Sequence, residues 1–357
     1  MTRILATCFG LGILLLLIAG CGSFDSDPST DISPAALRSR FSPLEVPTIQ
    51  TSQQPRINLG RELFYDRRLS TGENTSCNSC HLLNAYGVDG HSYSTGHDGK
   101  LGGRNAPTVY NASLNLAQFW DGRAKDLVEQ AKGPILNPVE MGMPSSDEVV
   151  TRIKSIPSYA SAFRQAFPDS SDAITFDHFA EAVATFEQGL LTPSRWDRYL
   201  DGDTSALNEQ EKQGLKLFLK TGCASCHAGR GVGGNSYQKL GYPKSWPNQH
   251  DLGRYQVTSL DRDRMVFKVP TLRNIEKTGP YFHDGQVASL NEAIDLMAQY
   301  QCSEKLRSAE IDQIATFLKT LTGPVPERYI ANVDSAAKDD TVAMPRNKSA
   351  NGKGAAR

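Results

Sequence analysis

Two copies of one five-residue pattern limit what this chain can fold into more than any other feature. The sequence reads C-N-S-C-H at residues 77–81 and C-A-S-C-H at residues 223–227. Two thiols on one helical turn can reach both vinyl groups of a porphyrin, and the next histidine then lies beneath the iron. Zinc, disulfide and redox uses of C-x-x-C do not require that histidine in both copies. We therefore predict two covalent haem c groups, attached through Cys77, Cys80, Cys223 and Cys226, with His81 and His227 as iron ligands.

The composition excludes one class of partner. The chain has 357 residues, of which 39% are hydrophobic, and is long enough for two domains with cores of their own. Its formal net charge is -1 and its pI is about 6.7, so it lacks the excess of basic residues that nucleic-acid binding calls for.

The first residues are typical of an exported protein. Arg3 is followed by an almost wholly apolar run at residues 4–19, which predicts a signal peptide at residues 1–20. The stretch that ends in Cys21 resembles a bacterial lipobox, so we expect a periplasmic protein lipid-anchored through Cys21. Gly22, where an Asp would suggest retention in the inner membrane, favours the outer membrane. An uncleaved anchor helix, or a signal peptide with a chance cysteine, is the alternative.

We predict a mostly α-helical fold of two cytochrome c-like domains, one haem each, joined by long loops. Helices are expected around Leu59, Leu63 and Phe64, at 177–191 and at 308–322. Two more are expected after the capping residues Asn208 with Glu211 and Ser289 with Glu292. The predicted segments are a flexible tether at 21–54, the N-terminal haem domain at 55–200, the C-terminal haem domain at 201–330 and a disordered tail at 331–357.

Beyond its haem motifs, the chain resembles the bacterial di-haem cytochrome c peroxidases, together with their relatives that oxidise tryptophan on a partner protein. The resemblance covers residues from about 57 to 325. The stretches that carry it are SCNSCH at 76–81, RNAPTVYNAS at 104–113, AQFWDGRAKDLVEQAKGPILNPVEM at 117–141, GCASCHAG at 222–229, VPTLRN at 269–274 and TGPYFHDG at 278–285.

The resemblance implies that the N-terminal haem is the peroxidatic, low-potential one. His97 matches the family's detachable second iron ligand, with His91 as the competing candidate, or both are surface histidines. Glu140 matches the distal acid, which takes a proton from the near peroxide oxygen and returns it to the far one. Gln130 matches the amide beside it. Without the resemblance, these two residues read as a solvated carboxylate and a surface amide.

For the C-terminal haem, the resemblance implies an electron-transfer centre. Met297 has the family position of the second iron ligand, and a thioether there raises the potential. The tryptophan-oxidising relatives carry a tyrosine instead, so Met297 favours the peroxidase branch. Trp120 matches a tryptophan between the haems, although it also reads as a core residue. His283 matches a family histidine near the haems whose role stays open, and Cys302 reads as a small buried residue.

The resemblance also implies a calcium ion between the domains. Asn105, Thr278 and Pro280 match its ligands, and oxygen donors suit calcium, but no carboxylate cluster accompanies them.

The expected function is reduction of hydrogen peroxide by electrons from a small cytochrome c or cupredoxin, in a possible homodimer. A di-haem electron carrier without peroxidase activity, or an enzyme that oxidises a partner protein, is the alternative.

Overall fold

The computed structural model describes residues 31–330. Over this part the chain is mostly helical, with two short strands, which confirms the predicted fold class. The signal peptide at residues 1–20, lipidation at Cys21 and the disordered tail at residues 331–357 lie outside it and stay predictions.

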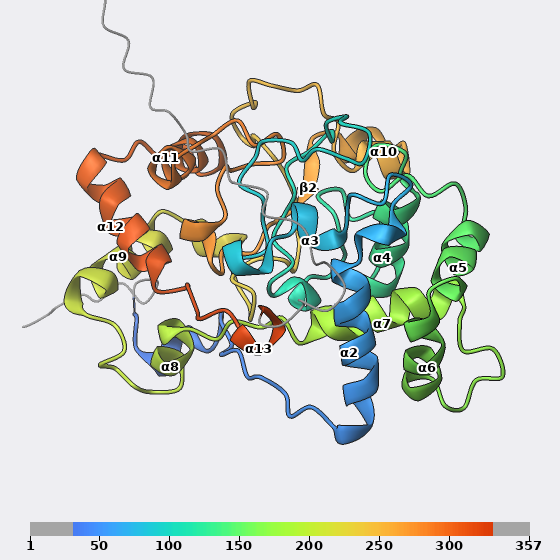
Figure 1. Cartoon of the computed structure of the whole chain (residues 1–357). Helices are drawn as coiled ribbons and strands as arrows, with labels where there is room; N and C mark the ends of the chain where they lie inside the picture. The colour runs from blue at the N-terminus through green and yellow to red at the C-terminus, as the bar shows by residue number, and fades with distance from the viewer. Residues whose placement is uncertain (1–30, 331–357) are drawn as a thin grey trace, which may run out of the picture.

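The first haem motif belongs to a group of helices on the right-hand side of Figure 1. Leu59, Leu63 and Phe64 share the buried face of α2, as predicted, and this face packs on α7. Helix α7 covers most of the helix predicted at 177–191. The helices of this group are α2 (Gln54–Tyr65), α3 (Cys77–Cys80), α4 (Leu127–Leu136), α5 (Ser146–Lys154), α6 (Pro157–Ala166) and α7 (Phe176–Gln188).

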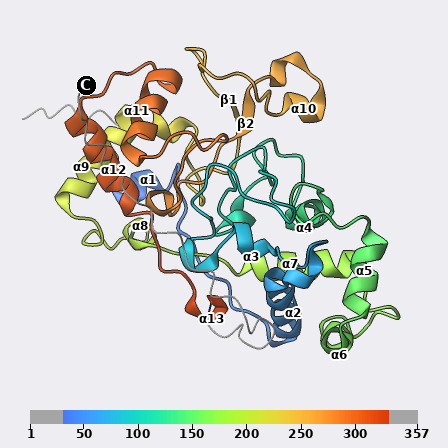
Figure 2. The ribbon, with the colours of Figure 1, turned by 45° about the horizontal axis from the view of Figure 1, so that its top comes forward.

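The second haem motif belongs to a similar group of helices on the opposite side (Figure 1 and Figure 2). Asn208 and Glu211 form the predicted capping box at the start of α9, which packs on α12. The cysteines of the motif lie at a 3₁₀ turn, Cys223–Ser225. The helices on that side are α8 (Arg195–Leu200), α9 (Glu209–Lys220), α11 (Leu290–Gln301) and α12 (Ser308–Lys319). The segment between α9 and α11 contains α10 (Tyr255–Thr258), which lies on the right-hand side of Figure 1, and β1 (Tyr237–Lys239), which pairs antiparallel with β2 (Val266–Lys268).

The two groups share a repeated segment that our sequence predictions did not include. The pattern Pro-Thr-x-x-Asn occurs at 107–111 and at 270–274, and Phe-x-Asp-Gly at 119–122 and at 282–285. Equivalent residues adopt the same uncommon backbone: φ is 61° at Asn111 and 63° at Asn274. Both asparagine side chains donate to the buried Thr192 hydroxyl, at 2.8 and 2.9 Å. Thr192 therefore joins the two halves at equivalent points.

The main helix pair of each half also packs in the same way. Gly60 in α2 is so close to α7 that a Cβ there would lie 1.9 Å from the Ala182 carbonyl oxygen. Gly214 in α9 is equally close to α12, where the corresponding distance to the Gln313 carbonyl oxygen is 2.0 Å. The repeat therefore extends from the loops to the helices that form each core.

The N-terminal end of the described chain corrects part of the predicted tether. Helix α1 (Pro34–Leu37) and the residues after it bury Leu37 and Phe41 in the core of the second half, where Phe41 packs edge-on against Trp196. The flexible tether predicted for 21–54 is therefore wrong for this stretch, because its apolar side chains are buried. Leu190 belongs to the first core and Trp196 to the second, so the two cores meet near the start of α8, a few residues before the predicted boundary at 200.

The C-terminal end of the described chain packs against the first half. Helix α13 (Glu327–Ile330) places Tyr329 in the core of the first half, where it packs edge-on against Phe186. The Tyr329 carbonyl oxygen accepts hydrogen bonds from Arg61 Nε at 3.1 Å and the Tyr65 hydroxyl at 3.4 Å. Each end of the described chain therefore completes the half that lies farther from it in sequence.

Candidate functional site: two haem cavities

The first haem motif faces a cavity between α3, α4 and α7. Cys77, Cys80 and His81 line it together with apolar residues such as Phe179 and Val183. Burial lowers the pKa of His81, which favours the neutral imidazole that binds iron, and Nδ1 lies 3.3 Å from the Gly87 carbonyl oxygen. Two thiols and one imidazole beside an apolar space fit a covalently bound haem.

The structure brings the predicted acid and amide to this same cavity. Glu140 and Gln130 both line it, Gln130 from α4 and Glu140 from the loop that follows. Burial raises the pKa of Glu140, while the Arg123 guanidinium and a hydrogen bond from Asn137 oppose the shift. That bond, from Asn137 Nδ2 to Glu140 Oε1, measures 2.7 Å and fixes the carboxyl group. An acid held in this way can exchange a proton with a small molecule in the cavity.

His97 lies at the tip of a hairpin closed by the bridge between Thr95 and Leu101. Its peptide N–H donates to the Glu140 carbonyl oxygen at 2.8 Å. Its imidazole lies against Gly142, where a Cβ would come within 2.2 Å of Nε2. His91 is exposed, and its carbonyl oxygen accepts a hydrogen bond from Asn105. The hairpin of His97 is thus attached to the loop that carries Glu140.

Glu187 is a cavity residue that the sequence predictions missed. It follows Phe179 and Val183 at helical spacing on α7, and all three line the first cavity. Its side chain is fully buried, and this burial raises the pKa of Glu187 to about 8. The apolar periodicity of the helix gives one signal for it, because a glutamate stands where the pattern requires an apolar residue.

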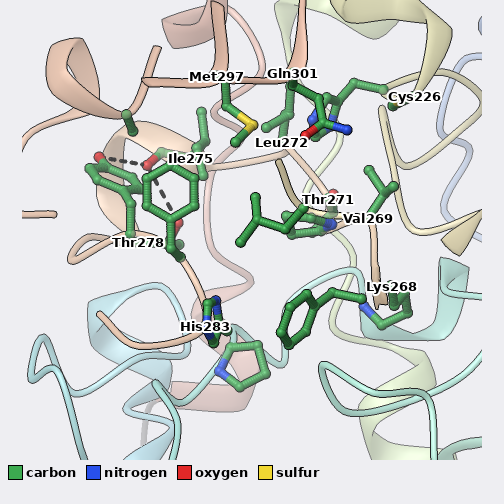
Figure 3. Close-up of a pocket in the computed structure, with 18 of the residues that line it drawn as sticks. Cys226, Lys268, Val269, Thr271, Leu272, Ile275, Thr278, His283, Met297 and Gln301 are labelled. Carbon is green, nitrogen blue, oxygen red and sulfur yellow. Dashed lines mark hydrogen bonds between the residues drawn. The ribbon is translucent and has the colours of Figure 1, made fainter. Parts of the chain in front are cut away.

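The second haem motif faces a larger cavity, of about 220 Å³. Cys223, Cys226 and His227 line it from one side, and Met297 of α11 points its sulfur into it (Figure 3). Burial lowers the pKa of His227 to about 4, so the imidazole is neutral. A buried imidazole and a thioether in one apolar cavity fit a haem with both axial positions filled.

The repeat shows what stands in the first cavity where the second has its methionine. Helices α4 and α11 begin at equivalent leucines, Leu127 and Leu290. Counting along both helices from these leucines, Met297 corresponds to Pro134, which lines the first cavity. Proline has no atom that can bind iron. The helix that offers an axial ligand in the second cavity therefore offers none in the first.

Trp120 and His283 occupy equivalent positions of the repeat and meet at the second cavity. Both line it, and their rings pack edge to face with centroids 6.5 Å apart. Trp120 Nε1 donates to the Asn105 carbonyl oxygen at 2.9 Å. The His283 ring stacks on Phe267 with a centroid distance of 4.4 Å. Trp120 is thus partly buried in an aromatic cluster, as well as at a cavity wall.

The three predicted calcium ligands belong to the lining of the same cavity. Asn105, Thr278 and Pro280 all line the second cavity, although they come from different halves of the repeat. In the part of the chain that the structure describes, no group of three or more His, Cys, Asp or Glu side chains forms a metal site. Any cation here would depend on carbonyl, amide and hydroxyl oxygens.

Cys302 differs from its prediction as a buried small residue. It is half-buried after the C-terminus of α11, and its thiol is hydrogen-bonded to the Cys223 thiol. This bond lowers the pKa of Cys302 and raises the pKa of Cys223. Sequence spacing gave no signal for this contact, because the two cysteines lie on separate elements.

Comparisons with known proteins agree with this arrangement. The family model of di-haem cytochrome c peroxidase matches residues 54–205, and that of cytochrome c matches residues 211–322. A cytochrome c551 peroxidase of Nitrosomonas europaea is 49% identical over 290 residues, which cover 80% of this chain and 86% of that protein. This chain belongs to the di-haem cytochrome c peroxidase family.

A second relative and a solved structure extend the likeness. A cytochrome c551 peroxidase of Pseudomonas aeruginosa is 45% identical over 281 residues, covering 77% of this chain and 80% of its own length. A solved MauG-like protein associated with microbial copper homeostasis superposes with a TM-score of 0.69 at 29% identity, over 81% of this chain and 95% of that one.

None of the helices between residues 31 and 330 is long and apolar enough to cross a membrane.

Proposed function

We propose that this protein is a cytochrome c peroxidase that reduces hydrogen peroxide to water at its first haem cavity. The observation that carries the proposal is the difference between two equivalent cavities. The second has His227 and Met297 for both faces of an iron, whereas the first has His81, Pro134 and an acid–amide pair. A cavity in which His81 would bind the haem beside a buried acid suits a reactant, and a cavity in which both His227 and Met297 would bind the haem suits electron transfer.

The residues of the first cavity divide the chemistry among them. Cys77 and Cys80 would hold the haem, and His81 would bind its iron. When bound, this haem supplies an iron that binds peroxide and delivers the electrons that break the O–O bond. His97 would cover the open face in the resting protein, and its hairpin would move aside to admit peroxide.

Glu140 would move the proton. Its carboxylate takes a proton from the near peroxide oxygen and returns it to the far oxygen, which leaves as water. Gln130 would hold the peroxide or a water by hydrogen bonds from its amide. Two electrons and two further protons complete the conversion of one peroxide to two waters. The bond from Asn137 supports this role, because it keeps one Glu140 oxygen in place while the other exchanges the proton.

The second cavity would receive the electrons. Cys223 and Cys226 would hold its haem between His227 and Met297, and a small periplasmic cytochrome c or cupredoxin would be the donor. Trp120 would support transfer to the first cavity from its place in the aromatic cluster. Met297 also favours a peroxidase over an enzyme that oxidises a partner protein, because the relatives with that activity carry a tyrosine there.

The remaining proposals concern the setting of the enzyme. A calcium ion at Asn105, Thr278 and Pro280 would join the two halves, since these residues line the same cavity and come from different halves. We also propose a periplasmic location with a lipid anchor at Cys21, at the outer membrane, and a homodimer. The lipobox-like sequence before Cys21 supports the anchor.

The Glu140→Gln variant tests the proton step. Glutamine keeps an oxygen for the Asn137 bond but cannot exchange the proton, so we expect turnover to fall roughly 100- to 10,000-fold. The measurement is peroxide-dependent oxidation of a ferrocytochrome c by the half-reduced enzyme, with both haems counted by pyridine haemochrome. Glu129→Gln, at an exposed carboxylate on α4, is the matched control. Undiminished turnover in Glu140→Gln would exclude the acid–base role.

The half-reduced protein also separates the peroxidase from a plain electron carrier. We expect the first haem to show a high-spin, ligand-accessible signature once the second is reduced. If both haems instead stay low-spin and inaccessible in every redox state, the electron-carrier function gains support.

A further inference from the structure

Lys268, at the end of β2, is a buried cation at the wall of the second cavity (Figure 3). The residue is only 6% exposed. Burial lowers the pKa of Lys268 to about 8, and no acidic neighbour opposes this shift. A buried ammonium without a counter-charge is costly, and proteins rarely keep one without a partner.

The fold does not require a lysine here. In the repeat, Lys268 corresponds to Asn105, two residues before the shared Pro-Thr-x-x-Asn pattern. The first half therefore builds the same backbone with a neutral residue. The lysine is thus specific to the second cavity and calls for an explanation there.

The protein does not supply the missing anion. Among the residues that line the second cavity there is no aspartate or glutamate, and Lys239, the cavity's other lysine, is exposed. The group that occupies the cavity must then bring the negative charge. Haem carries two carboxylate side chains, the propionates, in addition to the vinyl groups that Cys223 and Cys226 would use.

We propose that Lys268 binds a propionate carboxylate of the second haem and thereby raises the potential of that haem. The proposal requires the second haem to occupy this cavity, as described under the proposed function. A cation at the haem edge repels the positive charge of the oxidised iron. Reduction removes one such charge, so the cation favours the reduced form and raises the potential.

The same residue is tied to Trp120 through its backbone. The Lys268 peptide N–H donates to the Trp120 carbonyl oxygen at 2.8 Å. Lys268 therefore holds the haem carboxylate with its side chain and the tryptophan with its main chain. This makes it a positioning residue between the second haem and the aromatic cluster.

The test compares three variants of the holoprotein: Lys268→Met, Lys268→Arg and, as the matched control, Lys239→Met on the paired strand. The readouts are the midpoint potentials of both haems by spectroelectrochemical titration and the thermal unfolding midpoint. We expect Lys268→Met to shift the second haem to a lower potential and leave the first unchanged. Lys268→Arg should stay near the wild-type value, and Lys239→Met should shift it less than Lys268→Met.

Stability provides a second, independent sign. A paired lysine stabilises the protein, so Lys268→Met should lower the unfolding midpoint, whereas loss of an unpaired buried charge would raise it. The proposal is overturned if Lys268→Met moves the potential no more than Lys239→Met, or if it raises the unfolding midpoint. Pyridine haemochrome separates this result from a missing second haem, which would instead count against the haem assignment of the cavity.

Discussion

The two halves of the molecule use one scaffold and differ at a few cavity positions. Both pack a glycine of one helix against the backbone of another, and both carry the Pro-Thr-x-x-Asn loop. They differ where Pro134 corresponds to Met297 and where Glu187 corresponds to Leu318. The scaffold therefore accounts for binding a haem, and the differences account for what each haem would do.

The two cavities also differ in the charge that they hold. Near pH 7 the buried carboxyl group of Glu187 in the first cavity is mostly protonated and uncharged, because its pKa is raised to about 8, whereas the second cavity carries the buried ammonium of Lys268. A neutral residue stands at the equivalent position in the other half in both cases. Since charge near a haem changes its potential, the two cavities are electrostatically distinct while their backbones are alike.

The variant Pro134→Met should have the largest effect on the difference between the two cavities. It places a thioether where the second cavity has one, so we expect the open face of the first haem to be blocked. Turnover should fall roughly 100-fold or more, because peroxide must then displace a ligand. Peroxidase assays and the spin state of the half-reduced protein check this. A high-spin first haem with normal turnover would show that α4 and α11 do not present these residues equivalently.

The two buried glycines test whether the helix pairs are alike. Gly60→Ala and Gly214→Ala each place a methyl group against a carbonyl oxygen, so each should lower the free energy of unfolding by about 1–3 kcal/mol. Chemical denaturation of each holoprotein measures this. Gly103→Ala, at a loop glycine with open space around it and no positive φ, controls for chain entropy. A large cost at one helix pair alone would contradict equivalent packing.

A further test concerns pH. Because the pKa of Glu187 is raised to about 8 in the folded protein, its unfolded form loses the proton first. Stability should therefore fall between about pH 4.5 and 8, by up to about 1.4 kcal/mol per pH unit from this residue. Glu187→Gln should flatten that slope, whereas Glu181→Gln, at a less buried carboxylate on the same helix, should not. Equal slopes in wild type and Glu187→Gln, measured by denaturation at several pH values, would contradict the assignment.

The sequence predicted the haem motifs and the long amphipathic helices well, because both are local patterns. Leu59, Leu63 and Phe64, and the capping box of Asn208 and Glu211, lie as expected. Gln130 and Glu140 were identified through the family resemblance, and the structure brings them to one cavity.

What the sequence did not reveal depends on contacts between distant segments. Nothing local to Phe41 shows that it packs on Trp196, and a stretch rich in Ser, Pro, Thr and Asp hides its few apolar residues. Lys268 reads as an ordinary surface lysine until the strand places it at a cavity wall. The repeat could be read from the sequence, since Pro-Thr-x-x-Asn and Phe-x-Asp-Gly each occur twice. Aligning the two halves on these patterns would have shown that Pro134 stands where the second half has Met297.

The crossed ends of the described chain have a consequence for the order of synthesis. Tyr329, near the last described residue, completes the core that surrounds the first haem motif. Phe41 can be buried only after Trp196 of the second half has been made. If the chain is exported N-terminus first, as proposed above, neither half can be completed until nearly all of the chain has emerged. We expect the first motif to remain accessible to the haem-attachment machinery throughout that interval, so both haems can be inserted before the molecule closes.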